Sequence, residues 1–233
     1  FFTGNHQSPW YLVAFGMVGA TISGISVVSV PGMVGTSQFG YLQTVLGFFF
    51  GYVVVAYVLL PLYYRLHLTS IYEYLNNRFG SEAHRTGSLF FIVAKLVSSA
   101  TKLYVAALVL QQFIFDAWHI PFWVTVTLCV ALMWLYTRRG GIRTLVWTDS
   151  LQTLFLLIAL ILMVFNTIQL VNASPSDALR TVYESTWSHT FTLGDWHSRQ
   201  NFFKQFLSGI FIVIVMTGLD QDMMQKNLTC RTL

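Results

Sequence analysis

Six long apolar segments constrain this 233-residue chain more than any other feature, because the polar stretches between them carry nearly all of its charges. The segments are residues 10–34, 41–64, 87–115, 121–136, 145–171 and 202–216, the last extending towards residue 224. A helix needs about 20 mainly apolar residues to cross a bilayer, and a helix satisfies its own backbone hydrogen bonds there. The sequence therefore predicts an all-α membrane protein with about six transmembrane helices.

The composition argues against a soluble domain. The chain is 55% hydrophobic and only 9% charged, whereas soluble domains carry roughly 25% charged residues. Because so few residues are charged, the chain cannot cover a water-soluble particle with polar surface. The expected partner is therefore the lipid bilayer. The formal charge of +4 includes no basic tract interleaved with aromatic residues, so no nucleic-acid partner is expected.

Lysine and arginine are distributed unevenly between alternate loops. Eight follow the second, fourth and sixth segments: Arg65, Arg78, Arg85, Arg138, Arg139, Arg143, Lys226 and Arg231. Three lie after the fifth segment: Arg180, Arg199 and Lys204. Because basic loops stay cytoplasmic during insertion, the first group of loops and the N-terminus of this segment are expected to be cytoplasmic. Residues 172–201 are then an extracytoplasmic loop.

A short helix is expected in the polar stretch after the second segment. Thr69 or Ser70 can cap it, and Glu73 follows Ser70 at the spacing of a capping box.

The first apolar segment is the most informative for function. Apart from two isoleucines, residues 19–26 are small or carry a hydroxyl group, and Pro31–Gly32 follows. One interpretation is a face that packs closely against another helix. The other is a cation site, because Pro31–Gly32 is expected to interrupt the helix and free backbone carbonyls for Na⁺.

Two lysines lie within the third segment. Lys95 and Lys102 are seven residues apart and share one helical face. Since a charge at the bilayer centre costs ~2.5–3.5 kcal/mol on insertion scales, Lys102 is expected to be paired inside the helix bundle. Lys95 lies closer to an interface.

Three aspartates have two interpretations each. Asp149 begins the fifth segment, either as a helix N-terminal acid stabilised by the helix dipole or as an acidic group on a cation route. Asp220 and Asp222 follow the sixth segment, either at the membrane interface or in a cytoplasmic vestibule.

Enzyme motifs are missing from the sequence. It contains no Gly-x-Ser-x-Gly elbow, no phosphate-binding glycine loop with lysine and no His-Glu-x-x-His pair. We therefore expect neither an enzyme nor a bound cofactor.

Residues 136–152 resemble a signature of the sodium:solute symporter family, Y-x-x-x-GG followed by VWTD and a glutamine. The run reads YTRRGGIRTLVWTDSLQ. The first apolar segment and residues 60–79 and 218–228 agree with the family in order and spacing, so the resemblance covers essentially the whole chain. The family includes sodium/glucose, sodium/proline and sodium/sialic acid transporters.

The resemblance implies a leucine-transporter-type fold of two inverted five-helix repeats. Residues 1–171 would be the first repeat, residues 172–201 an extracytoplasmic loop, and residues 202–233 the first helix of the second repeat. The chain would then be the N-terminal half of a transport core, and alone it is not expected to transport.

The resemblance also implies positions for the ligands. Backbone carbonyls at Gly19 and Ile22 would hold Na⁺ as the coupling ion, with Asp149 on the cation route and no other metal. The substrate-binding positions map to Ser23, Ser26, Gln43, Val213 and Met216. Val213 and Met216 stand where sugar carriers have an asparagine and a stacking tyrosine, which argues against a sugar.

The expected function is Na⁺-coupled symport of a small organic solute across the plasma membrane, a bacterial inner membrane, by alternating access. The alternative is a transporter-like sensory input module of a membrane signalling protein. A channel or a membrane enzyme is a further rival. Sequence beyond Leu233, with or without a kinase module, would separate the signalling protein from the transporter.

Overall fold

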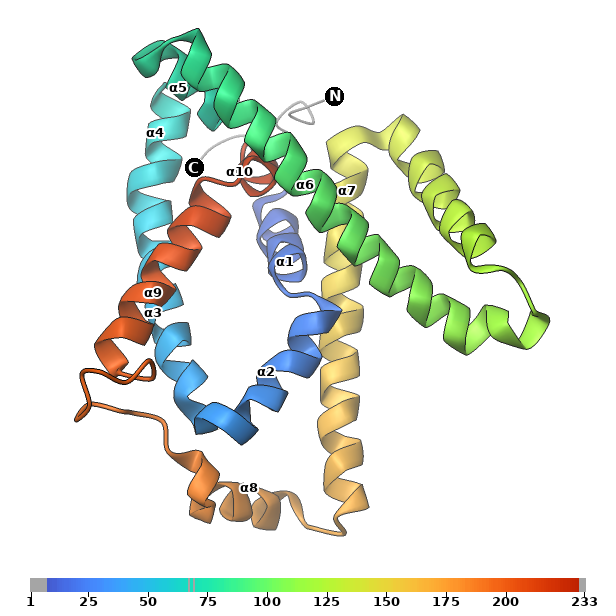
Figure 1. The fold of residues 1–233 in the computed structure, drawn as a ribbon, viewed down its shortest axis with the longest axis vertical. Coiled ribbons are helices and arrows are strands. Elements are labelled where there is room, and N and C mark those ends of the chain that lie inside the picture. The colour runs from blue at the N-terminus through green and yellow to red at the C-terminus, as the bar shows by residue number, and fades with distance from the viewer. Residues whose placement is uncertain (1–7, 67, 69, 231–233) are drawn as a thin grey trace.

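The computed structural model describes residues 8–66, 68 and 70–230, with the side chains of Tyr136 and residues 139–143 left out. Within that part the chain is almost entirely helical, and its β structure is a single bridge between Thr192 and Asn201. The predicted all-α fold is confirmed (Figure 1). The helices are α1 (Trp10–Thr21), α2 (Gly24–Ser37), α3 (Tyr41–Val54), α4 (Leu60–Arg65), α5 (Ile71–Phe79), α6 (Ser81–Leu110), α7 (Phe122–Leu170), α8 (Pro175–Glu184), α9 (Phe202–Val213) and α10 (Gln221–Asn227).

Three helical stretches are long and apolar enough to cross a membrane: Gly24–Arg65, Ser81–Trp118 and Thr144–Leu170. A fourth results if Phe202–Gly218 and Gln221–Asn227, which meet at a bend of 68°, form one span. The other two predicted segments contain shorter apolar helices, Trp10–Thr21 and Phe122–Leu135. All six predicted segments are thus helical, while six complete crossings stay a prediction.

The first apolar segment is broken, but not where we expected. Pro31 lies inside α2, so the prediction that Pro31–Gly32 interrupts the helix is wrong. The break is at Ile22 and Ser23, which both have extended backbones. There the Ser23 side chain accepts a hydrogen bond from the Ser26 amide and caps α2, a local alternative to continuing the helix. Proline is tolerated within membrane helices when its neighbours satisfy the freed backbone groups.

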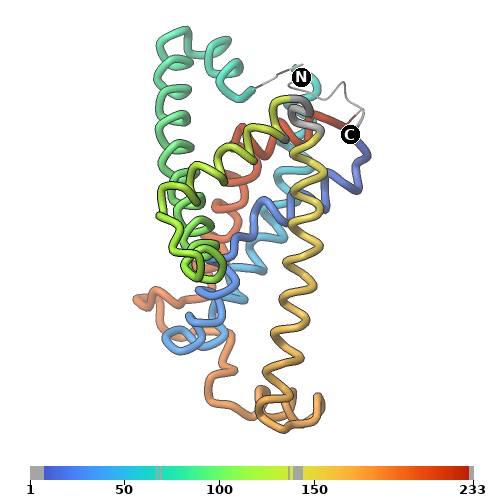
Figure 2. Tube along the Cα trace, turned by 90° about the vertical axis from the view of Figure 1, so that its right-hand side faces the viewer, coloured from blue at the N-terminus to red at the C-terminus, as the bar shows by residue number. Residues whose placement is uncertain are grey.

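The predicted fourth and fifth segments belong to one run of helical hydrogen bonding, α7. Figures 1 and 2 show this run as two straight rods, and Figure 1 shows the sharp reversal that joins them at one end of the molecule. The reversal falls between Leu135, where the shorter apolar helix ends, and Thr144, where the membrane-length one begins. The expected polar loop is therefore a tight helical turn.

The basic stretches gather at one end of the molecule. The reversal of α7, helix α5 and helix α10 lie towards the top of Figure 1, whereas α8 and the α2–α3 junction lie at the bottom. The expected cap of α5 is present, because the Glu73 amide donates to Ser70 Oγ at 3.2 Å. Thr69 and Arg231 lie outside the described residues. The arrangement agrees with the predicted grouping of the loops, and the assignment of this end to the cytoplasm stays a prediction.

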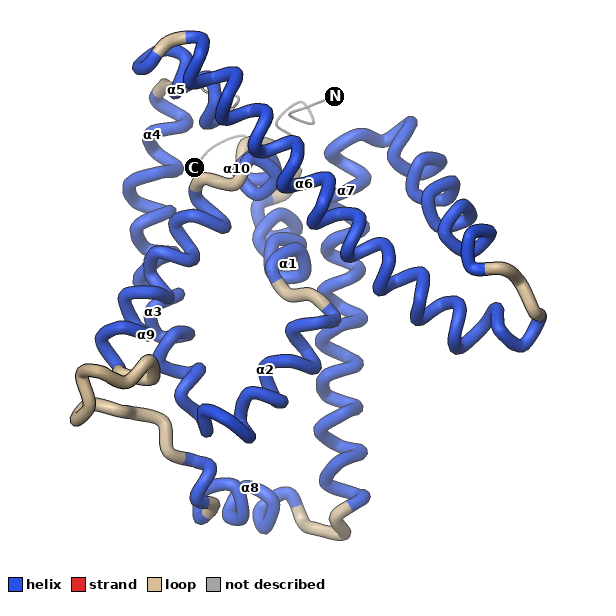
Figure 3. Tube along the Cα trace, in the orientation of Figure 1, coloured by secondary structure: helices blue, strands red, loops and turns tan. Residues whose placement is uncertain are grey.

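Helices α3 and α9 run side by side in the same direction (Figures 1 and 3). Glycine makes their contact close: a Cβ on Gly51 would lie 2.8 Å from the Ile210 carbonyl oxygen. Gly47 and Gly51 form a Gly-x-x-x-Gly pair, which lets two backbones approach within a membrane. Beyond this contact a buried cluster continues through Val55, Tyr63, Val213, Met224 and their neighbours.

Residues 171–201 join α7 to α9 and contain α8. Ser174 caps α8 by accepting a hydrogen bond from the Asp177 amide at 3.1 Å. Figure 3 shows the stretch after α8 as a long loop that returns to the start of α9. Asn201 ends this loop fully buried, and its Oδ1 accepts from the Phe203 amide at 3.1 Å, which starts α9.

Candidate functional site

The break in the first apolar segment lies where α1 crosses α7. At this crossing Gly19 packs against the α7 backbone, so that a Cβ at Gly19 would lie 2.9 Å from the Asp149 carbonyl oxygen. The Gly19 carbonyl accepts a hydrogen bond from Gln152 Nε2 at 3.0 Å. Two of the three predicted cation residues, Gly19 and Asp149, are therefore neighbours in space.

Polar side chains of α7 contact further backbone carbonyls of α1. Ser150 Oγ lies 2.9 Å from the Leu12 carbonyl oxygen, and Thr153 Oγ1 lies 2.9 Å from that of Phe15. Each hydroxyl also lies 2.8 Å from a carbonyl of its own helix, so its one proton is shared between two acceptors. The sequence reasoning missed these roles. The available signal was the hydroxyl and amide groups of residues 150–153 in an otherwise apolar helix, where each needs a partner.

The residues at the break itself are Ile22, Ser23 and Ser26. The Ile22 amide closes the last turn of α1 by donating to Val18 O at 3.0 Å. Its extended ψ of 127° turns its own carbonyl out of the helical direction. Ser23 Oγ lies 3.1 Å from Ser26 Oγ, so two predicted substrate residues are in contact. Both side chains are half-buried.

The other three predicted substrate residues lie on α3, α9 and the π-helical stretch Ile214–Gly218 that continues α9. Gln43 is fully buried, and within the described part of the chain its side-chain amide bonds to backbone groups, those of Gly40, Gln200 and Thr192. Val213 is buried against Gly51 of α3, whereas Met216 is 59% exposed. Among the described residues, no hydrogen bond joins Gln43 to the serine pair at the break.

An ion-pair network lies beside α1, the helix that ends at the break. Lys226 Nζ is 2.7 Å from Asp149 Oδ2 and 3.7 Å from Asp222 Oδ1. Lys95 Nζ is 2.8 Å from Asp220 Oδ2 and 3.9 Å from Asp222 Oδ2. The network therefore connects α6, α7 and α10.

The geometry gives Asp149 a partner. Asp149 is five residues after Thr144, where the membrane-length rod of α7 begins, so it lies near the N-terminal end of that rod. Its carboxylate also pairs with Lys226, whose side chain is only 7% exposed, and both interpretations of Asp149 stay predictions. Asp220 both pairs with Lys95 and caps α10, since its Oδ1 accepts from the Asp222 amide at 2.9 Å.

Comparison with known proteins identifies the family of this chain. The family model of the sodium:solute symporters matches residues 1–230. The chain belongs to the sodium:solute symporter family. The resemblance found in the sequence is thereby confirmed, and with apolar helices of this length the chain is a multi-pass membrane protein.

Curated relatives agree with this membership. The chain is 28% identical to the rabbit (Oryctolagus cuniculus) sodium-dependent multivitamin transporter over 94% of its own length and 34% of the relative. It is 28% identical to the human sodium/iodide cotransporter over 100% of its length and 36% of the relative, and 25% identical to human sodium-coupled monocarboxylate transporter 2. The chain thus spans about a third of the length of these relatives, which are transporters and not enzymes. No solved structure matches it.

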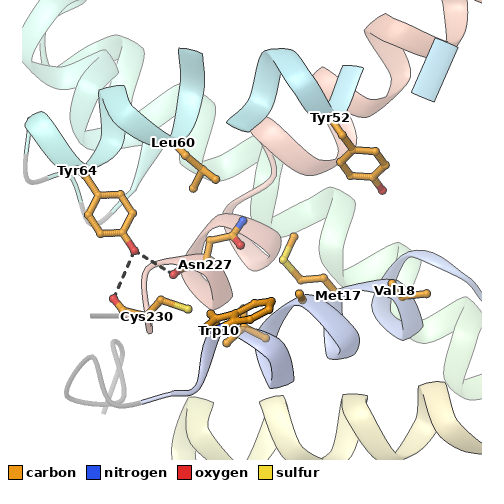
Figure 4. A pocket seen from close by; sticks show the side chains of 10 residues that line it. Trp10, Met17, Val18, Tyr52, Leu60, Tyr64, Asn227 and Cys230 are labelled. Carbon is orange, nitrogen blue, oxygen red and sulfur yellow. Dashed lines mark hydrogen bonds between the residues drawn. The ribbon is translucent and has the colours of Figure 1, made fainter. Parts of the chain in front are cut away.

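A pocket of about 380 Å³ lies between α1, α3, α4 and α10 (Figure 4). Its lining is mostly apolar: Trp10, Val13, Ala14, Met17, Val18, Tyr52, Leu60, Tyr64, Asn227 and Cys230. At one edge Tyr64 Oη contacts the backbone oxygens of Asn227 and Cys230 at 3.2 and 3.3 Å. Because none of the eight predicted site residues lines it, this pocket is distinct from the predicted ligand positions. Burial raises the pKa of the Cys230 thiol at its rim.

The two lysines of α6 have different environments. Lys95 is paired, as described above, and its ammonium also lies 5.7 Å from the centre of the Phe91 ring. Lys102 is exposed on α6, and none of the ion pairs among the described residues involves it. The expectation that Lys102 is paired inside the complete helix bundle stays a prediction.

Proposed function

We propose that this chain is part of a secondary active transporter that couples the movement of Na⁺ to the transport of a small organic solute. The observation that carries the proposal is the break of an apolar helix at Ile22 and Ser23, with Gly19 packed on the helix of Asp149. Membership of the family over residues 1–230 supports it. So do the relatives, whose names describe sodium-dependent transport.

The break supplies groups of the kind that bind Na⁺. Unwound backbone carbonyls at discontinuous membrane helices coordinate Na⁺ in secondary transporters. Here we assign this role to the Gly19 and Ile22 carbonyls, which flank the end of α1. A carbonyl oxygen has two lone pairs, so the Gly19 carbonyl can keep its bond from Gln152 while it contacts an ion. Asp149 lies on the face of α7 that contacts Gly19, and we assign it the role of attracting a cation to this region.

The solute would bind next to the ion, at Ser23 and Ser26. Their hydroxyls are half-buried, and each can donate and accept a hydrogen bond. Gln43, Val213 and Met216 stay candidates for the wall of this site in another conformation. The relatives are named for vitamins, iodide and monocarboxylates, so monocarboxylates and vitamins are the first solutes to test.

Transport would proceed by alternating access. Segments one, two and six would move as a unit against segments three and four, and the close α3–α9 contact supports such a unit. The Na⁺ gradient would supply the work, at about 2.3 kcal/mol per charge per 100 mV plus the concentration term. We place the protein in the plasma membrane, a bacterial inner membrane, with the N-terminus of this segment in the cytoplasm.

The test is uptake by proteoliposomes that contain the full-length protein. Labelled monocarboxylates, vitamins and a sugar are each offered with an inward gradient of Na⁺ or of choline. We expect at least one solute to accumulate with Na⁺ only, and to be lost when an ionophore dissipates the gradient. Uptake that is indifferent to Na⁺ for every transported solute would contradict the proposal.

A further inference from the structure

Among the side chains that the structure describes, the network around Lys226 holds more negative than positive groups. At formal charges, three carboxylates (Asp149, Asp220 and Asp222) face two ammonium groups (Lys95 and Lys226). The excess is one negative charge, which an additional cation would neutralise. The network lies against α1, the helix that ends at the break, because a Cβ on Gly16 would lie 3.4 Å from the Asp149 Cβ and one on Gly19 would lie 2.9 Å from the Asp149 carbonyl oxygen.

Lys226 is placed between two carboxylates at unequal distances. Its ammonium is in contact with Asp149 at 2.7 Å, while Asp222, on its own helix, lies at 3.7 Å. The Lys226 side chain is 7% exposed and that of Asp149 is 19% exposed, whereas that of Asp222 is 47% exposed. A buried ammonium needs a partner, and here a second carboxylate is within reach if the first is taken. Lys226 therefore has two available positions.

We propose that the Lys226 ammonium competes with Na⁺ for the Asp149 carboxylate. While the carbonyl site at the break is empty, Lys226 neutralises Asp149, as in this structure. When Na⁺ occupies Asp149, the ammonium pairs with Asp222, and its return to Asp149 displaces the ion. This inference rests on the proposed Na⁺ coupling, which it deepens by naming the residue that weakens Na⁺ binding and promotes Na⁺ release.

The placement of the two partners gives the competition a structural consequence. Asp149 is on α7, which packs against α1, whereas Lys226 is on α10, which follows the α3–α9 contact through a bend of 68°. The ion pair therefore joins these two parts of the molecule, in addition to the hydrogen bond from the Ser8 amide to the Thr229 carbonyl oxygen at 3.2 Å. Na⁺ at Asp149 would remove the ion pair, and Na⁺ release would restore it.

The experiment is a Na⁺ titration of the purified full-length protein, in which Na⁺-dependent thermal stabilisation is compared with that by choline. Replacing Lys226→Gln removes the competitor, and we expect the half-saturating Na⁺ concentration to fall about fivefold or more. Lys226→Arg keeps the charge and should leave that concentration unchanged or raise it. A decrease for Lys226→Arg would overturn the proposal, even if Lys226→Gln does not fold.

Lys95→Gln is the matched control, because it removes one positive charge from the same network without touching Asp149. We expect a shift well below that of Lys226→Gln, and equal shifts would mean a general effect of charge. In an Asp149→Asn background, Lys226→Gln should have no further effect on the half-saturating concentration.

The two proposals fail in different ways. If the wild-type protein is not stabilised by Na⁺ and takes up no solute with it, the proposed function fails and the competition fails with it. If the wild type responds to Na⁺ while Lys226→Gln shows the same half-saturating concentration, only the competition is overturned. Lys226 would then be a structural ion-pair partner.

Discussion

Gly47 of α3 and Gly209 of α9 meet backbone against backbone: a Cβ on Gly47 would lie 2.9 Å from the Gly209 Cα, and one on Gly209 would lie 3.0 Å from the Gly47 Cα. Neither position has room for a side chain, because the backbone cannot move aside as a flexible side chain can. We expect Gly209→Ala to destabilise the protein by about 1–3 kcal/mol, the usual range for overpacking.

Thermal unfolding in detergent measures this effect. Gly35→Ala in α2 is the control, since a Cβ there meets no atom within 4 Å. It should leave the unfolding temperature unchanged or raise it slightly, as alanine favours a helix. Equal unfolding temperatures for Gly209→Ala and the wild type would show that α3 and α9 are not held this closely.

Substitutions of Ser23 and Ser26 should distinguish a role in capping α2 from a role in binding a ligand. Leucine at either position fills the space at the break, so we expect both substitutions to abolish Na⁺-dependent uptake while folded protein is still produced. Ser23→Leu should also lower stability by about 1 kcal/mol, because the side-chain cap of α2 is lost. Thr36→Leu, at the other end of α2, is the control and should keep uptake. Survival of transport in both serine variants would mean that the site is placed wrongly.

Gln43 should hold the loop after α8 onto α3. Gln43→Leu removes the bonds to Gln200 O and from the Thr192 amide, at 3.1 and 3.3 Å, and leaves these groups without a partner. Leaving these groups unpaired costs about 1–3 kcal/mol, so we expect the loop to open at least severalfold more often. Trypsin cleavage after Arg199 measures this opening.

Gln38→Leu provides the comparison for the Gln43 variant. Gln38 is also near this loop, but it makes one exposed bond, to Thr186 O at 3.3 Å. Its loss should change the cleavage rate little. Identical rates for both variants would show that Gln43 does not hold the loop, which would leave a direct ligand role as its main function.

Cys230 should react slowly with thiol reagents at neutral pH. Burial raises its pKa, so a smaller fraction is thiolate at a given pH than for an ordinary thiol near about 8.5. In a Cys129→Ser background, the alkylation rate should keep rising with pH beyond that value, about tenfold per unit below the pKa. A plateau of the rate already near pH ~8.5 would contradict the burial of this thiol.

Some local features of the fold follow from neighbouring residues alone. The helix α5 begins where Ser70 and Glu73 predict it, because a cap involves groups within one turn. Pro31–Gly32 predicted a break of the first segment, but the break is at Ile22 and Ser23. Its actual position at Ser23 depends on a serine that caps α2 and on the packing of Gly19 against α7. The second of these is not a local property.

The sequence by itself determined that this protein lies in a lipid bilayer, that its apolar segments are helical and which family it belongs to. Hydropathy and sequence motifs suffice for this because they are patterns of residues within a few helical turns. Only the tertiary structure decided which polar groups meet. The carboxylate of Asp149 is paired with Lys226 at 2.7 Å, a partner far along the chain. Likewise the backbone partners of Gln43 in the loop after α8 are known only from the tertiary structure, in which this loop lies against α3. Such pairs are chosen by the packing of helices far apart in the chain, which no local pattern contains.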